Sequence, residues 1–213
     1  MFNVCLQCGQ YSVEKRIDPS GPFAICPHCG HGQLFLQQPL FVVTGASGAG
    51  KSSVALPLVE VLRREAVVLD TDILWRPEFA TPEDNYRSYR ELWLRLATNI
   101  GQSGLPVVLV GTAVPDQFEH LPERRYFSTT RYLGLVADDE ELTRRLRARP
   151  AWRSADSPKF IGEMLQFNQW LKDHAGSTSP PITLLNTTAE HLNQTVQQVA
   201  DWFRALVSPS RTS

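Results

Sequence analysis

The sequence predicts an α/β domain built on a parallel sheet, preceded by a small module of different composition. From Pro39 onward, short apolar runs alternate with longer amphipathic stretches, which is typical of βα units around a parallel sheet. Residues 1–38 are instead rich in Cys, Gly, Gln and Pro and short of aliphatic runs, so they need a staple to fold. We therefore expect two units, 1–38 and 39–213.

Composition places the chain among ordinary globular proteins. Of its 213 residues, 42% are hydrophobic and 20% are charged, and the net charge is −1. This balance gives no overall field that would attract nucleic acid or an anionic membrane. Because the N-terminus lacks the basic and apolar regions of a secretory signal and no run is long enough to span a bilayer, we expect a cytoplasmic protein without a membrane segment.

Five apolar runs are the expected strands of the sheet. They are rich in Val and Leu and lack polar alternation, as strands that are buried on both faces should be. They cover residues 40–44, 66–70, 106–110, 132–136 and 182–185. Amphipathic segments between and after them predict helices at 51–64, 84–102, 138 to just before Pro150, 159–174 and 189–206.

The N-terminal module carries two CxxC pairs with 17 residues between them. In a reducing compartment this spacing favours metal ligation over disulfides, and two such pairs can close a tetrahedral site with four thiolates. The expected ligands of a Zn²⁺ ion are Cys5, Cys8, Cys26 and Cys29. The segment resembles a zinc ribbon.

Two features limit what this zinc site can do. Four thiolates fill the coordination shell even without His28 and His31, so the zinc is expected to be structural. The basic residues of the module, Lys15 and Arg16, are matched by nearby acidic ones, so nucleic-acid binding is not favoured.

A complete phosphate-binding loop follows the first strand of the main domain. GASGAGKS matches the pattern GxxxxGK[ST] and lies between an apolar run and an amphipathic stretch, as that motif requires. Backbone N–H groups of such a loop surround a β-phosphate, and the helix start adds its positive end. The sequence therefore predicts a nucleoside triphosphate ligand, with Lys51 on the β- and γ-phosphates and Ser52 on Mg²⁺. The expected nucleotide-binding residues are Gly45, Ala46, Ser47, Gly48, Ala49, Gly50, Lys51, Ser52, Ser53 and Arg145.

Several classes of phosphate-loop protein do not fit. The chain lacks the guanine-specifying NKxD pattern, the DxxG switch and the LSGGQ signature, and the third strand ends in Gly111-Thr112 instead of an acidic residue. An acidic pair, Asp70-x-Asp72, follows the second strand instead. With the late arginine cluster, these features resemble the nucleoside and nucleotide kinases among small P-loop kinases, over roughly residues 39–207.

The resemblance implies a sheet order of 2-3-1-4-5 and roles for the acidic pair. Asp70 would orient Mg²⁺ or its waters, and Asp72 would act as base or orienting group beside the acceptor hydroxyl. A carboxylate that accepts the hydroxyl proton also suits phosphoryl transfer on chemical grounds. The alternative is that both carboxylates cap the following helix.

Arginines cluster after the fourth strand, where the resemblance implies a lid that closes over the triphosphate. Arg149 and Arg153 flank Pro150, which ends the preceding helix, and they are expected to meet the γ-phosphate. The alternative for Arg144 and Arg145 is pairing at i,i+4 with Glu140 and Glu141, respectively.

These expectations converge on an ATP-dependent kinase that phosphorylates a small hydroxyl-bearing acceptor, with a nucleoside or nucleotide favoured over a sugar or antibiotic. Its cofactors would be ATP, Mg²⁺ and a structural Zn²⁺. Two alternatives stay open: a polynucleotide 5′-hydroxyl kinase, and a nucleotide-dependent binding or assembly factor that uses the loop as a switch. The sequence does not specify the acceptor, a preference for ATP over GTP, or the oligomeric state.

Overall fold

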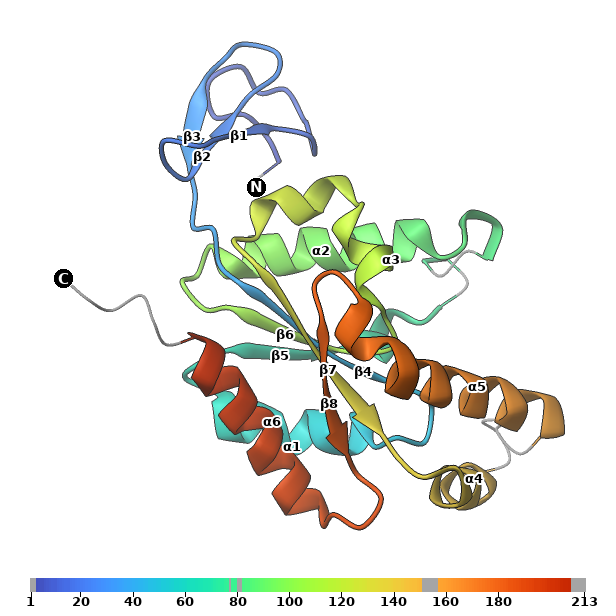
Figure 1. The fold of residues 1–213 in the computed structure, drawn as a ribbon. Helices are drawn as coiled ribbons and strands as arrows, with labels where there is room; N and C mark the ends of the chain where they lie inside the picture. Colours follow the sequence, from blue (N-terminus) through green and yellow to red (C-terminus); the bar gives the residue numbers. More distant parts are fainter. Residues whose placement is uncertain (1–2, 77, 80–81, 151–156, 208–213) are drawn as a thin grey trace.

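The computed structural model describes residues 3–76, 78–79, 82–150 and 157–207. The described chain forms a three-stranded antiparallel sheet near the N-terminus and a five-stranded parallel sheet with helices on both faces (Figure 1). The strands of the large sheet are β4 (Leu40–Gly45), β5 (Val67–Asp70), β6 (Val107–Val110), β7 (Thr130–Val136) and β8 (Ile182–Asn186).

The order of the large sheet is β5-β6-β4-β7-β8, and every neighbouring pair is parallel. In chain order this is 2-3-1-4-5, so the expected topology is confirmed. The phosphate-loop strand β4 is central, with β6 on one side and β7 on the other. The carboxyl ends of parallel strands meet at one edge of a sheet, where ligands bind in folds of this kind.

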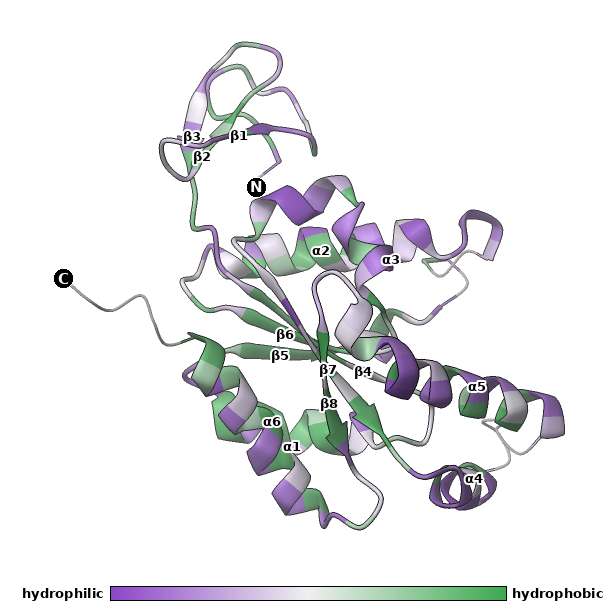
Figure 2. Ribbon diagram, viewed as in Figure 1, coloured by the Kyte–Doolittle hydropathy of each residue, from purple (hydrophilic) through white to green (hydrophobic). Residues whose placement is uncertain are grey.

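The two faces of the sheet bury alternate residues of each strand. On one face, Leu40 and Val42 pack with α2 (Arg87–Gly101), α3 (Pro115–Glu119) and α5 (Pro158–His174). On the other face, Phe41 and Val43 pack with α1 (Lys51–Leu62) and α6 (Leu192–Val207). Figure 2 shows hydrophobic strands between helices whose outer faces are hydrophilic. Burial on both sides explains why the inner strands β4, β6 and β7 read as unbroken apolar runs. The edge strand β8 departs from the prediction, because Ile182 is buried but Thr183 and Leu184 are exposed.

Helix α2 begins later than the sequence predicts. Asn85 and Tyr86 adopt left-handed backbone conformations, with φ of 52° and 58°, which interrupt any helix before Arg87. The Asp84 carboxylate accepts hydrogen bonds from the N–H groups of Arg87 and Ser88, at 3.0 and 2.9 Å, and so caps the first turn. Helix α4 (Asp139–Arg147) ends before Pro150, as predicted.

The N-terminal sheet consists of β1 (Arg16–Asp18), β2 (Phe23–Ile25) and β3 (Gly32–Leu34). It contacts the main domain at a short 3₁₀ segment, η3 (Pro122–Tyr126), where the ring of Tyr126 meets Phe35 edge to face at 6.1 Å. The Tyr126 hydroxyl accepts from the backbone N–H of Lys15 at 2.9 Å and donates to the Val13 carbonyl. The buried ring of Tyr126 therefore joins the two units.

Within the described part of the chain, no helix combines the length and the apolar character that a membrane crossing requires.

Candidate active site

The phosphate loop connects the end of β4 to the start of α1. Gly48 and Gly50 have positive φ, 92° and 103°, which other residues rarely adopt. Space is also limiting, because a Cβ on Gly45 would lie 2.5 Å from the Leu135 carbonyl oxygen and one on Gly48 would lie 2.8 Å from a methyl of Leu142. Conformation and space together require glycine at these positions, and they leave the loop backbone exposed to a ligand.

The loop lysine is held by the loop itself. Lys51 Nζ donates to the carbonyl oxygens of Gly45 at 2.7 Å and Ala46 at 3.1 Å. Burial lowers the pKa of Lys51 to about 8, while the negative charges of Asp72 and Asp70 act in the opposite direction. A group with that pKa is protonated at pH 7, so the ammonium keeps the charge that a triphosphate needs.

A cavity of about 390 Å³ opens above the loop and has the size of a small-molecule site. Asp72, from the turn η1 after β5, and Arg149, from the segment after α4, join the loop residues in its lining. Of the residues expected from sequence, the lining includes Ser47, Gly48, Ala49, Gly50, Lys51, Ser52, Ser53, Asp72, Arg145 and Arg149. Gly45, Ala46 and Asp70 lie outside the lining, and Arg153 falls outside the described residues.

The two carboxylates after β5 differ in their surroundings. Asp70 Oδ1 accepts the backbone N–H of Asp72 at 2.9 Å and caps the 3₁₀ turn η1 (Thr71–Leu74), so the capping alternative holds for Asp70. Asp72 is exposed and points into the cavity. Between them, Thr71 is buried, and its carbonyl oxygen accepts the hydroxyl of Tyr89. These two contacts hold the backbone of the turn in place, so the Asp72 side chain is directed into the cavity.

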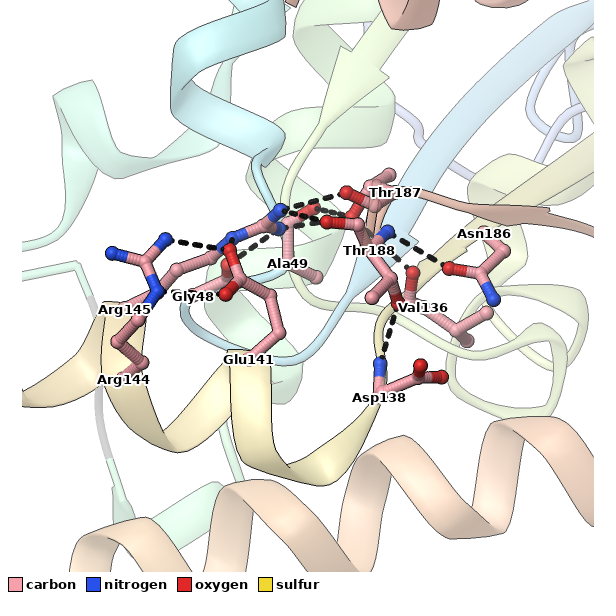
Figure 3. Close-up of polar contacts among 10 residues, drawn as sticks. All are labelled: Gly48, Ala49, Val136, Asp138, Glu141, Arg144, Arg145, Asn186, Thr187 and Thr188. Atoms are coloured by element: carbon pink, nitrogen blue, oxygen red, sulfur yellow. Dashed lines mark hydrogen bonds and ion pairs between the residues drawn. The ribbon is translucent and has the colours of Figure 1, made fainter. Parts of the chain in front are cut away.

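Arg145 connects the phosphate loop to the segment after β8 (Figure 3). Its guanidinium donates to the Thr187 carbonyl at 2.7 Å, to the Thr187 hydroxyl at 3.0 Å and to the Gly48 carbonyl at 3.5 Å. Glu141 accepts from Arg145 at 2.7 Å, as the spacing suggested. Thr187 donates in turn to the Ala49 carbonyl at 3.1 Å. Arg145 therefore shapes the cavity wall in this structure, and sequence alone did not indicate its bonds to Thr187.

The neighbouring arginine has a purely local partner. Arg144 binds both carboxylate oxygens of Glu141 at 2.7 Å, whereas the sequence spacing predicted a pair with Glu140. The correction follows from geometry, because Arg144 and Arg145 share Glu141 at i,i+3 and i,i+4 on one helix face. These two hydrogen-bonded arginines lower the pKa of Glu141 to about 2.

The four cysteines of the N-terminal module converge on one point. Their Sγ atoms all lie within 4.8 Å of one another, with Cys5–Cys29 at 3.7 Å and Cys8–Cys26 at 3.8 Å. Ligands about 2.3 Å from a central Zn²⁺ in a tetrahedron are about 3.8 Å apart, so the cluster has the right dimensions. Backbone N–H groups of Cys8 and Gln7 lower the pKa of Cys5 and so favour its thiolate, whereas burial and the neighbouring cysteines raise the pKa of Cys29.

A buried lysine accompanies this cluster. Lys15 is 1% exposed, and its ammonium donates to the Gln33 side chain at 3.3 Å. Burial lowers its pKa, and the thiolates of Cys5, Cys26 and Cys8 oppose that shift. A Zn²⁺ ion with four thiolates carries a net charge of −2, so a nearby cation offsets part of it. The sequence showed Lys15 only as one of two basic residues in the module.

The fold is similar to those of several solved kinase structures. No family model matches the chain, and no curated protein sequence matches it significantly. Among solved structures, a gluconokinase from Sinorhizobium meliloti is 21% identical, with a TM-score of 0.55 and coverage of 81% of this chain and 95% of that one. The shikimate kinase from Acinetobacter baumannii, in complex with shikimate, is 18% identical, with a TM-score of 0.53 and coverage of 82% and 98%.

A third structure is similar along nearly its whole length. The APS kinase from Mycobacterium tuberculosis, in complex with AMPPNP and APS, is 16% identical, with a TM-score of 0.51 and coverage of 78% of this chain and 98% of that one. The expected likeness to small P-loop kinases is therefore confirmed as a likeness of fold.

Proposed function

We propose that this chain is an ATP-dependent phosphotransferase that phosphorylates a small hydroxyl-bearing acceptor, most simply a nucleoside or nucleotide. One observation carries the proposal: Lys51, Asp72 and Arg149 come from three separate elements and line one cavity with the phosphate loop. In that lining the Asp72 carboxylate can accept the proton of an acceptor hydroxyl while Lys51 and Arg149 neutralise phosphate charge. The likeness of fold to a gluconokinase, a shikimate kinase and an APS kinase supports the same reading.

The nucleotide would bind with its β- and γ-phosphates on the loop. Backbone N–H groups of residues 48–52 and the ammonium of Lys51 would neutralise the phosphate charge. Ser52 would hold Mg²⁺, and Asp70, whose Oδ1 caps the turn and which lies outside the cavity lining, would act on the ion through its waters. The ion would offset charge on the β- and γ-oxygens. The nucleobase would lie toward Thr187, Glu190 and Leu192, which line the same cavity.

The transfer step uses Asp72 and the arginines. The acceptor hydroxyl oxygen forms a bond to the γ-phosphorus while the bond from that phosphorus to the β,γ-bridging oxygen breaks, and ADP leaves. The hydroxyl proton passes to the Asp72 carboxylate, which later releases it to water. Arg149 stabilises the charge that spreads over the γ-phosphoryl oxygens during transfer. We assign the same task to Arg153.

The proposal is tested by ADP release from purified protein with ATP and Mg²⁺. Pools of nucleosides, nucleotides, sugar acids and oligonucleotides with a 5′-hydroxyl are added in turn, and products are identified by mass spectrometry. We expect acceptor-dependent ADP release with one small-molecule pool and none from Lys51→Ala. If only oligonucleotides are phosphorylated, the acceptor is a polynucleotide and not a small molecule. If no acceptor in any pool is phosphorylated and a partner protein is retained only with ATP, the chain is a nucleotide-dependent switch and not a kinase.

A further inference from the structure

A second cavity, of about 210 Å³, adjoins the nucleotide cavity. Thr112 contributes to the lining of both, and Thr71 lines the second while the next residue, Asp72, lines the first. A molecule in the second cavity can therefore present a hydroxyl group to Asp72 and to a γ-phosphate on the loop. Its volume is below the ~300–1,000 Å³ of drug-sized sites, so it suits a ligand body of one ring.

Aromatic side chains form most of the wall. Trp75, Tyr86, Tyr89, Trp93 and Phe118 surround the cavity, and Val42 and Leu109 of the sheet form its floor. The rings of Trp75 and Tyr86 lie 5.2 Å apart at an angle of 33°, and Trp75 meets Tyr89 edge to face at 5.4 Å. Such a wall offers flat faces on which a planar ring can stack.

Two nitrogen donors of α2 in this wall lack a partner among the described residues. They are Nε of Arg90 and Nε1 of Trp93, and both atoms are buried. Trp93 is 1% exposed, and its Nε1–H is close enough to the Tyr89 hydroxyl to lower the pKa of that group, but the geometry is not that of a hydrogen bond. Burial also lowers the pKa of Arg90. A buried donor without a partner is unfavourable, and a ligand oxygen in the cavity would remove that cost.

Two other polar atoms in the wall already have partners. The Tyr89 hydroxyl donates to the Thr71 carbonyl, and Gln117 Oε1 accepts the backbone N–H of Val114 at 3.1 Å. An open-chain polyol would need a partner for each of its hydroxyl groups, and an aromatic wall supplies few. A flat ring with acceptor oxygens on its edge matches the two buried donors, Arg90 Nε and Trp93 Nε1, and exposes its faces to the aromatic wall.

We propose that the acceptor carries a single planar ring with carbonyl oxygens at its edge, as a pyrimidine nucleoside does, and that this ring binds in the cavity beside Trp75, Arg90 and Trp93. The ribose of such a nucleoside supplies the hydroxyl that faces Asp72. This inference rests on the proposed phosphotransferase function, because it identifies the class of acceptor for that reaction.

Binding is measured by tryptophan fluorescence, without ATP, during titration with uridine, cytidine, D-gluconate and shikimate. We expect uridine or cytidine to quench emission, because the ring stacks near Trp75 and Trp93, and we expect gluconate and shikimate to leave it unchanged. Arg90→Met keeps much of the side-chain length but removes the donors. It should weaken nucleoside binding roughly tenfold to a hundredfold, as expected for a lost charge-assisted hydrogen bond.

The matched control is Arg87→Met on the same helix. Arg87 is exposed, pairs with Glu91 at 2.8 Å and lies outside the cavity lining, so its loss should leave the affinity unchanged. Exposed Trp75 gives a second variant that does not disturb the core, and Trp75→Ala should weaken binding and reduce the quenching. Urea unfolding of each variant checks that it is folded.

Three results would overturn the proposal: no quenching by either nucleoside, quenching by gluconate or shikimate alone, or unchanged affinity in folded Arg90→Met and Trp75→Ala. Failure of the proposed function has a different signature. If uridine or cytidine binds as expected but no ADP is released with ATP and Mg²⁺, the ring site stands and the phosphotransferase reaction does not.

Discussion

Replacing Gly111 by alanine should displace the turn that carries Asp72. Gly111 follows β6, and a Cβ built there would lie 1.9 Å from Oγ1 and 2.9 Å from both Cβ and Cγ2 of Thr71, against 3.4–4 Å for ordinary contact. Rotating the Thr71 side chain does not relieve the contact with Cβ. Because Thr71 is buried and bonded through its carbonyl to Tyr89, the backbone at 70–72 must shift by about 0.5 Å or more.

Two measurable losses follow from that shift. Overpacking of this size typically costs about 1–3 kcal/mol, so urea unfolding should show a lower midpoint with an unchanged m-value. A displacement of about 1 Å in a catalytic group can lower turnover on the order of 10²-fold, so acceptor-dependent ADP release should fall much further than ATP binding does. The two assays separate damage to the fold from misplacement of Asp72.

A double mutant and a matched control test whether the close approach of Gly111 to Thr71 causes these losses. Thr71→Ala removes Oγ1 and Cγ2, so Gly111→Ala combined with it should recover part of the lost stability, with a coupling of about 0.5–3 kcal/mol. Gly162→Ala adds a Cβ in helix α5 with nothing within 4 Å, and it should be neutral or stabilising by up to about 1 kcal/mol. Wild-type stability and turnover in Gly111→Ala would show that the close approach of Thr71 does not position the turn.

Three further changes probe the remaining parts of the site. Lys51→Ala should weaken both ATP binding, measured by calorimetry, and turnover, because its charge faces the phosphates before and during transfer; unchanged binding would argue against that placement. Asp72→Asn should keep ATP binding but lower transfer by about 10²–10⁴-fold through loss of the proton acceptor, and wild-type transfer would exclude it as the base. Elemental analysis should find one Zn²⁺ per chain in the wild type and none in Cys26→Ser, whose residues 1–38 should also exchange amide hydrogens faster; zinc-free wild-type protein would refute the site.

Sequence patterns predicted the sheet well because each of its signals is local. An unbroken apolar run such as 40–44 can only be a strand with both faces covered, and the phosphate loop fixes the order of strand, loop and helix around it. The start of α2 was placed too early because the left-handed conformations of Asn85 and Tyr86 leave no signature in residue type. Asn tolerates that conformation, but Tyr gives no hint of it.

In the candidate site, too, local features could be predicted from the sequence and contacts between distant positions could not. Residues within the loop motif were identified because their spacing alone determines their geometry. The contacts of Arg145 with Thr187 and of Gly111 with Thr71 join positions that are 42 and 40 residues apart, and no pattern along the chain reports them. Arg90 and Trp93 lie within the helix expected at 84–102, and nothing in the sequence marks them as cavity residues, because helical spacing is the same for a packed side chain and for one that lines a cavity.

The contacts of the N-terminal module indicate whether zinc influences the binding of the acceptor or the binding of ATP. Gln102, which follows α2, exchanges hydrogen bonds with Leu36 at 2.9 and 3.1 Å. Glu123 in η3 is 1% exposed and accepts from Arg95 of α2 at 2.6 Å. Tyr126, at the end of the same segment, binds the backbone of the module. Each of these contacts leads to α2 or to the segment packed on it.

Helix α2 carries Tyr89, Arg90 and Trp93 of the acceptor wall, whereas the phosphate loop belongs to β4 and α1 and lines the nucleotide cavity. A module loosened by loss of zinc would therefore release one end of the acceptor wall while the loop keeps its own glycine turns and its bonds to Arg145. Zinc, although distant from the chemistry and closed to substrate, should bear on the KM for the acceptor far more than on the affinity for ATP. Equal losses in both would mean that the module supports the whole domain instead of one wall.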